Sequence, residues 1–261
     1  MRTKTIAIGL VVVMVALAGC GGVLGGDDGD GEETLANGTV GNDTAANGTG
    51  GDAAYPPGVT ESGLEDAAAL ANAHNESLSG EAYQLNVTQR QRIEQSGQNV
   101  TSAAERSIRV DGEGTFLVDA TSARVNQTVW GNQSTAVSRI ESGNDTSYQR
   151  MDPAQLRQQL SGHVLLRGYL EGGNYAVEST SDGQVTLTAD EWQGSDAVPL
   201  DGENVSAYES TVVVSEDGRV QEMTVHIESS RNDASMAMDV DFALDDDGDV
   251  TVERPEWVDE A

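Results

Sequence analysis

The chain has little of the chemistry on which disulfide-rich domains and nucleic-acid-binding proteins depend. Its 261 residues include a single cysteine, Cys20, so no disulfide can form within the chain. Lysine occurs only at Lys4, phenylalanine occurs twice, and 14 basic residues stand against 44 acidic ones. The resulting formal charge of −30 leaves no basic patch, so we expect no nucleic-acid partner.

The excess of acid has its own interpretation. A lysine-free, acid-rich mature surface is typical of proteins from extreme halophiles, and we interpret it as adaptation to concentrated salt. At about 1 M salt the Debye length is about 3 Å, so the carboxylates would act through hydration and solubility instead of long-range steering. Attraction of basic partners is the alternative reading of the same charge.

The first twenty residues have the pattern of a lipoprotein signal peptide. Arg2 and Lys4 precede an apolar run from Ile6 to Leu17, which is shorter than the ~20 residues of a membrane span. The sequence Leu17-Ala18-Gly19-Cys20 resembles a lipobox, whose cysteine is lipidated after cleavage. We therefore predict lipidation at Cys20 and a protein anchored in the membrane, on the extracellular face of the cytoplasmic membrane. A free thiol and a single-pass anchor are the alternatives.

Residues 21–58 are rich in Gly, Asp, Asn and Thr and almost free of large apolar side chains, which predicts a disordered linker. A flexible coil of this length spans ~35 Å on average. Three Asn-X-Ser/Thr sequons fall in this linker and seven lie beyond it, which suggests a glycoprotein. The glycosylation candidates are Asn37, Asn42, Asn47, Asn75, Asn86, Asn99, Asn126, Asn132, Asn144 and Asn204.

Residues 59–261 are predicted to form one domain that contains two helices. The segment Ser62-Gly63-Leu64-Glu65 has capping-box spacing, and apolar residues recur at helical spacing from Leu64 to Leu78. A second helix is predicted over 153–171, because Asp152 suits an N-cap, Pro153 suits the first helical position and two glycines follow.

The remaining segments alternate apolar and polar residues with a period of two, which indicates strands. Such alternation marks residues 83–88, 123–129, 208–214, 223–227 and 236–244. Further strands are predicted within 107–118 and 135–151, at Val185 and Leu187, and a last one through Val250 and Val252. Asp-Gly pairs between these segments are strong hairpin signals. We therefore predict an α+β fold in which a curved antiparallel β-sheet, a half-barrel, is covered by two helices.

This order of elements behind a lipobox resembles the LolA/LppX-like lipoprotein carriers, over about residues 60–258. The ending Arg254-Pro255-Glu256-Trp257-Val258 also resembles that of some haloarchaeal surface lipoproteins. The resemblance implies a cleft between sheet and helices that holds a lipid or another apolar ligand. The sequence departs from the carriers in having only two phenylalanines and ten sequons. The side chains expected at the cleft are Tyr83, Leu85, Leu160, Val164, Met236, Met238 and Phe242.

No catalytic or metal-binding pattern is present, so we expect no enzymatic activity, no cofactor and no metal. The three histidines are not paired at i, i+4, and no Gly-X-Ser-X-Gly elbow occurs. The acidic run Asp245–Asp249 has valine where a calcium loop needs glycine, so a hairpin turn with solvated acids is favoured over a weak cation site. A structural or interaction module of the cell envelope remains the alternative to a ligand-binding protein.

Overall fold

The computed structural model describes residues 55–198, 200, 202–231, 234–246 and 248–261. The predicted signal peptide, the predicted lipidation site Cys20, nearly all of the predicted linker and the sequons at Asn37, Asn42 and Asn47 lie outside these residues. The predictions made for them stay predictions. None of the helices in the described ranges is long and apolar enough to cross a membrane.

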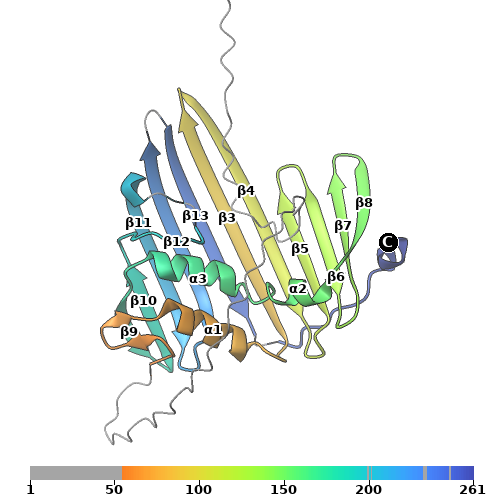
Figure 1. The fold of residues 1–261 in the computed structure, drawn as a ribbon, viewed down its shortest axis with the longest axis horizontal. Helices are drawn as coiled ribbons and strands as arrows, with labels where there is room; N and C mark the ends of the chain where they lie inside the picture. Colours follow the sequence, from red (N-terminus) through yellow and green to blue (C-terminus); the bar gives the residue numbers. More distant parts are fainter. Residues whose placement is uncertain (1–54, 199, 201, 232–233, 247) are drawn as a thin grey trace, which may run out of the picture. The chain divides into compact units, whose positions relative to one another are not determined.

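Eleven strands form one antiparallel sheet in the order β8-β7-β6-β5-β4-β3-β13-β12-β11-β10-β9 (Figure 1). Two meanders are joined where β3 pairs with β13, and every other neighbouring pair is consecutive in the chain. The predicted fold class, α+β with a curved antiparallel sheet and covering helices, is confirmed. The strands of this sheet are β3 (Tyr83–Gln95), β4 (Gln98–Val110), β5 (Phe116–Ser122), β6 (Asn126–Gly131), β7 (Ala136–Ser142), β8 (Asp145–Met151), β9 (Ala176–Ser181), β10 (Gln184–Ala189), β11 (Val205–Ser215), β12 (Val220–Arg231) and β13 (Ala234–Asp245).

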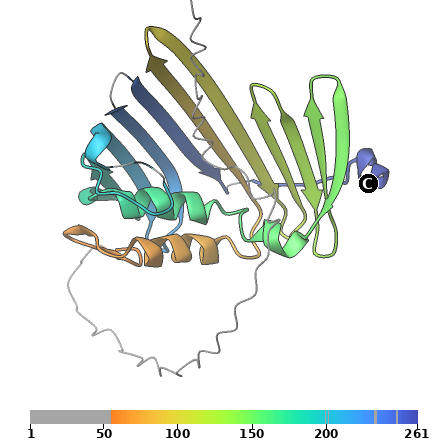
Figure 2. The same ribbon diagram turned by 45° about the horizontal axis from the view of Figure 1, so that its top comes forward.

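The sheet has an inner face, which carries Leu85, Phe116 and Phe242 and lies under the helices, and an outer face on the opposite side (Figure 2). Alternation along each strand decides which side chain belongs to which face. Along β13, for example, Met238, Val240 and Phe242 are buried while the intervening residues are exposed. The hydrophobic effect on this one face is what fixes the register of the strands.

Three helices cross the inner face: α1 (Ala67–Ser77), α2 (Pro153–Arg157) and α3 (His163–Gly172). Helix α1 begins later than expected, with Asp66 as its N-cap, because the preceding chain forms a short ribbon of β1 (Val59–Thr60) and β2 (Gly63–Leu64). The Ser62 hydroxyl does bond Glu65, but inside this ribbon's turn. In the views of Figure 1 and Figure 2 the helices cover one half of the long strands, and the other half extends beyond them.

The single helix predicted over 153–171 is wrong, because it is broken into α2 and α3. The cap at Asp152 and the position of Pro153 are confirmed for α2. Gly162 then adopts a left-handed φ of 72°. A Cβ at this position would lie 3.0 Å from Phe242 Cε2 and 3.1 Å from Leu85 Cδ2, so the backbone approaches the sheet where only glycine fits.

His74 joins α1 to the sheet and to the break between α2 and α3. Its Nε2 lies 2.9 Å from the Ser161 carbonyl, and its Nδ1 accepts from the Val220 N–H at 3.1 Å. A neutral imidazole with the proton on Nε2 satisfies both contacts. Burial is the largest cause that lowers the pKa of His74, to about 4, so this histidine is an uncharged structural residue.

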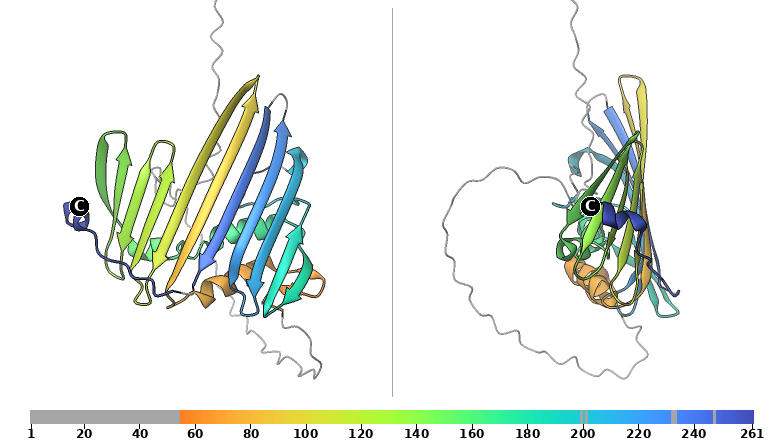
Figure 3. Two further views of the ribbon diagram at one scale, coloured as in Figure 1. Left: turned by 180° about the vertical axis from the view of Figure 1, so that it is seen from behind. Right: turned by 90° about the vertical axis from the view of Figure 1, so that its right-hand side faces the viewer.

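A second, smaller core lies on the outer face, where the C-terminal segment packs across the sheet (Figure 3). Trp130 of β6 and Val137 of β7 are covered there by Val258, which lies in the 3-10 helix η2 (Glu256–Glu260). The strand predicted through Val250 and Val252 is therefore wrong. These two residues carry no strand assignment, and their segment contributes apolar cover instead of ladder hydrogen bonds.

Candidate functional site

The side chains predicted to line a ligand cleft are mostly core residues of the inner face. Tyr83, Leu85, Leu160, Met238 and Phe242 are each at most 5% exposed, and Met236 is partly buried. Val164 on α3 is instead 57% exposed, because the break at Gly162 changes the face that α3 turns to the sheet. A role for any of them in ligand contact stays a prediction.

Apolar side chains are exposed where the inner face extends beyond the helices. Ile93 of β3 pairs with Val100 of β4 on one side and with Met236 of β13 on the other. Val100 is 50% exposed, and Ile93 and Met236 are partly buried. We call these three residues the apolar tip. Val100 is one of only three large hydrophobic side chains exposed in the described ranges, and the other two are Val125 and Val164.

The two faces of the sheet differ sharply in charge. The register places no carboxylate on the inner face of β3 to β7 or of β11 to β13 within the described residues. The outer face of the same strands carries all of their acids. These are Glu94, Glu105, Asp119, Glu141, Glu209, Glu222, Glu228, Asp239, Asp241 and Asp245.

Arg106 lies in the middle of this part of the inner face, and Arg231, at the end of β12, is the other arginine that the register places there. Arg106 pairs with Val87 of β3 and Ala120 of β5, so it belongs to the same face as Ile108 and Val110. It is partly buried and makes no hydrogen bond or ion pair with any residue in the described part of the chain. Burial lowers the pKa of Arg106, and the nearby Tyr83 opposes that effect.

Arg106 is a residue that our sequence reasoning missed. The sequence does contain a signal for it. Arg106 lies two and four residues before the apolar residues Ile108 and Val110, so in a strand all three side chains point to the same face. A charged residue on the apolar face of a predicted strand departs from the alternation that is typical of a half-buried strand. Burial also raises the pKa of Tyr83, so its phenol stays neutral beside the guanidinium.

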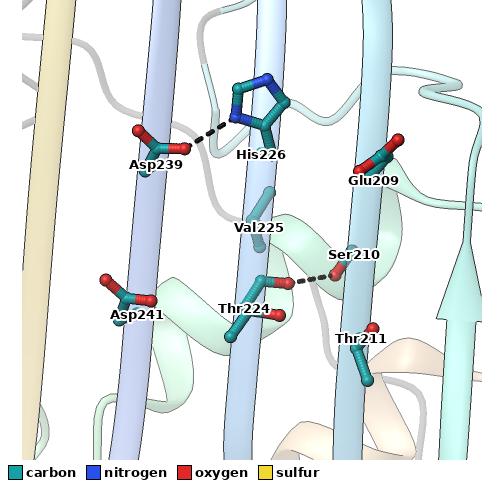
Figure 4. A pocket seen from close by; sticks show the side chains of 8 residues that line it. All are labelled: Glu209, Ser210, Thr211, Thr224, Val225, His226, Asp239 and Asp241. Carbon is teal, nitrogen blue, oxygen red and sulfur yellow. Dashed lines mark hydrogen bonds and ion pairs between the residues drawn. The ribbon is translucent and has the colours of Figure 1, made fainter.

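The outer face holds a shallow depression of about 200 Å³ between β11, β12 and β13 (Figure 4). His226 Nδ1 lies 2.7 Å from Asp239 Oδ1, and this hydrogen bond raises the pKa of His226. Asp241 pairs with Arg90 at 3.1 Å, and Glu209 lies across from the histidine. Within the described residues no three His, Cys, Asp or Glu side chains are arranged to hold a metal ion. These half-exposed pairs form a solvated surface network.

A buried tyrosine cluster lies under α3. The Tyr175 hydroxyl is 3.0 Å from that of Tyr208 and 2.8 Å from that of Ser210, and Ser210 donates to the Thr224 carbonyl at 3.0 Å. Burial raises the pKa of Tyr169, beside this cluster, to about 12, and it raises the pKa values of Tyr175 and Tyr208 as well. The hydroxyls remain neutral and serve mainly to satisfy one another.

The acidic run Asp245–Asp249 is not a simple solvated turn, because Asp246 forms an ion pair with Arg219. Arg219 also donates to the Ser77 carbonyl at 2.7 Å, which ties the end of α1 to this region. Asp247 lies outside the described residues. Asp246 therefore already has a cationic partner within the protein, the guanidinium group of Arg219.

The sequons within the described ranges differ in accessibility. Asn75, Asn99, Asn126 and Asn144 are exposed, whereas Asn86, Asn132 and Asn204 are partly buried. The Asn132 side-chain oxygen accepts from the backbone N–H groups of residues 134 and 135, and Asn75 accepts from Ser161 at 2.7 Å. Asn99, Asn126 and Asn144 are the candidates most open to a glycosyltransferase, and their modification stays a prediction.

Comparison with known proteins leaves the family open. No protein-family model and no curated protein matches the chain. A solved DUF1329 family protein from Desulfovibrio piger is 9% identical at a TM-score of 0.27, covering 70% of this chain and 92% of that one. A LolA superfamily protein from Nitrosomonas europaea is 12% identical at 0.25, covering 70% and 95%. A putative outer membrane lipoprotein-sorting protein domain from Vibrio parahaemolyticus is 6% identical at 0.27, covering 75% and 98%. At these TM-scores no property of those proteins transfers to this chain.

Proposed function

We propose that this chain is a lipid-anchored protein of the extracellular face of the cytoplasmic membrane that binds an apolar ligand on the inner face of its sheet. Binding is the proposed activity, with no catalytic step. The observation that carries the proposal is the apolar tip of Ile93, Val100 and Met236. In a chain of formal charge −30, these side chains lie on β3, β4 and β13, whose inner face carries no carboxylate, so an apolar ligand there meets no desolvation penalty from acids on these strands.

The energetics suit a reversible ligand. Fully covering a Val, Ile or Met side chain contributes roughly 1.5–3 kcal/mol, and the tip residues are partly covered already. Contact with the tip alone therefore supplies only a few kcal/mol, and a long apolar ligand must lie along more of the inner face than these three residues. Gln89 and Gln91, which lie between the tip and the helices, donate to methionine sulfurs at 3.1 and 3.0 Å. Sulfur is a weak acceptor, so this part of the face has hydrogen-bonding capacity left for a ligand.

A second function, a structural or interaction module of the cell envelope, is favoured by one specific observation. Five of the seven predicted cleft residues are at most 5% exposed, so the space between the helices and the covered half of the sheet is packed with side chains. In that case the exposed apolar tip would contact another protein. The two functions differ in whether the purified chain carries a small apolar molecule.

The anchor and the salt preference belong to the same proposal. Lipidation at Cys20 would hold the domain at the end of a linker of ~35 Å, close to a source of lipid. Replacing Cys20 with serine is expected to move the chain from the membrane fraction to the soluble fraction. Recovery of the serine variant in the membrane fraction at the level of the parent chain would contradict the anchoring. The acidic outer face is expected to make the melting temperature rise with salt concentration, because added salt screens the mutual repulsion of the carboxylates.

The ligand is tested by extracting the purified intact chain with organic solvent and analysing the extract by mass spectrometry. We expect a stoichiometric apolar compound from the parent chain and its loss from Val100→Glu, which places a carboxylate at the apolar tip. Ala103→Glu is the matched control, because Ala103 on the same strand is also exposed but lies on the outer face. An empty parent chain, or equal loss in both variants, would sink the ligand-binding function and leave the interaction module.

A further inference from the structure

Arg106 is an unusual residue for the surface on which it lies. Its neighbours in the register are Val87 and Ala120, and its neighbours along the inner face of β4 are Ala104 and Ile108. Across β5, the Gln127 side chain donates to the Ser138 hydroxyl at 2.9 Å. No carboxylate occurs on this face of β3 to β7 within the described residues, although the outer face of the same strands carries four.

An arginine in this position is costly for the fold alone. A partly desolvated guanidinium loses hydration, and an unpaired one regains nothing from a partner. Acidic residues are abundant in this chain, with 44 in total, yet none of those on β3 to β7 is placed on the inner face to neutralise Arg106. Arginine pairs instead with carboxylate or phosphate groups of ligands through a planar set of donors. The neutral Tyr83 phenol next to it is a further donor that has no hydrogen-bond partner in the described part of the chain.

We infer that Arg106 binds the negatively charged head of the ligand, which makes the ligand of the inner face an anionic amphiphile instead of a neutral lipid. The inference rests on the proposed function and names the chemical class of its ligand. The shared chemistry is a single acidic head, carboxylate or phosphate, on an acyl chain.

The dimensions of the inner face decide how such a ligand lies. Val100 lies six residues from Arg106 along β4, which corresponds to ~20 Å at about 3.3 Å per residue. An acyl chain in a bilayer leaflet occupies about half of the ~30 Å hydrocarbon core. Those ~15 Å are shorter than the ~20 Å to the apolar tip, so a chain whose head is bound at Arg106 must lie more extended than it does in a bilayer to reach Val100.

The test compares two probes that differ only in charge. Binding of radiolabelled palmitate and of methyl palmitate is measured on the intact chain, for the parent and for Arg106→Gln, Arg106→Lys and Arg92→Gln. Arg92 is the matched control, because it is an exposed arginine on the outer face of the adjacent strand β3. Acetate, and separately inorganic phosphate, is added as a competitor to separate a free anion site from an amphiphile site.

We expect the parent to bind palmitate at least about tenfold more tightly than its ester, a difference of about 1.4 kcal/mol. Arg106→Gln should weaken palmitate binding to the level of the ester and leave ester binding unchanged, and Arg106→Lys should restore part of the preference. Arg92→Gln should behave as the parent, and neither acetate nor phosphate should compete at millimolar concentration. The inference would be overturned if the parent bound palmitate and methyl palmitate with equal affinity, or if Arg106→Gln kept the parent's preference for palmitate. In either case, binding of the ester would still support the proposed function. Binding of neither probe would overturn both.

Stability supplies an independent readout that does not depend on ligand. Removing an unpaired, partly buried charge should raise the melting temperature of ligand-free Arg106→Gln by about 2–4 °C, whereas an arginine needed by the fold would give a decrease.

Discussion

The buried imidazole of His74 predicts a specific loss of stability in mild acid. His74 is 0% exposed, and each ring nitrogen faces a backbone group. Adding a proton to Nδ1 would point an N–H at the Val220 N–H, which is a donor itself. Burial is the main reason that the pKa of His74 falls from 6.5 to about 4, and Arg219 and His163 lower it further.

The sign and size follow from linkage between proton binding and folding. Because the pKa is lower in the folded chain than in the unfolded one, the unfolded chain binds the proton first as pH falls. The stability that neutral His74 provides is complete above about pH 6.5, declines between pH 6.5 and 4, and is then lost, for a total of ~3.4 kcal/mol at ~1.36 kcal/mol per pKa unit. Between pH 7.5 and 5.5 the free energy of unfolding should fall by about 1.3 kcal/mol.

The assay is urea denaturation at constant salt in a background of His163→Gln and His226→Gln, which leaves His74 as the only histidine of the three. The window from pH 7.5 to 5.5 stays above the ordinary range of carboxylates. Adding His74→Gln in the same background should flatten the dependence on pH. A flat profile while His74 is present, or a rise in stability toward pH 5.5, would refute the reasoning.

Three further changes test other parts of the fold by urea denaturation. Tyr175→Phe removes the hydroxyl that contacts both Tyr208 and Ser210, and leaves the Tyr208 hydroxyl only its 3.5 Å contact with the Tyr169 carbonyl. It should lower the free energy of unfolding by about 1–3 kcal/mol; an effect below ~0.3 kcal/mol would contradict the role of this cluster. Gly131→Ala places a Cβ 2.3 Å from Phe116 Cζ and should cost about 1–3 kcal/mol through overpacking, whereas an unchanged midpoint would show that the ring moves aside freely. Val258→Asp buries a carboxylate in the outer-face core and should cost roughly 2–4 kcal/mol; tolerance of it would mean that the C-terminal segment does not cover the sheet.

Local signals in the sequence were sufficient for most of the sheet. The period-two patterns around Tyr83 and Phe242 and the Asp-Gly turn at residues 182–183 predicted real strands and a real hairpin, because each depends only on neighbouring residues. The break at Gly162 could not be read in this way. The space that would hold a Cβ at Gly162 is taken by Phe242, which is 80 residues away in the chain, so the requirement for glycine appears only in the folded structure.

The site was harder to predict than the fold for the same reason. The apolar residues chosen as cleft candidates belong to the face that the helices cover, and a sequence pattern identifies the apolar face without showing how far its cover extends. Val100 and Ile93 were not selected, although they become neighbours of Met236 once β3 pairs with β4 and β13. A single charge in the pattern of β4 does not reveal the role of Arg106, because its neighbours Val87 and Ala120 are brought beside it only by strand pairing.

The central claim is that a ligand lies on the inner face of the sheet, and photo-crosslinking tests it most directly. The intact chain is irradiated with a fatty acid that carries a diazirine near the end of its chain, and the adducts are located by peptide mass spectrometry. The account predicts adducts at the apolar tip of Ile93, Val100 and Met236 that unlabelled palmitate competes away. Adducts confined to outer-face residues such as Thr101 and Ala237, or no competable adduct at all, would contradict it.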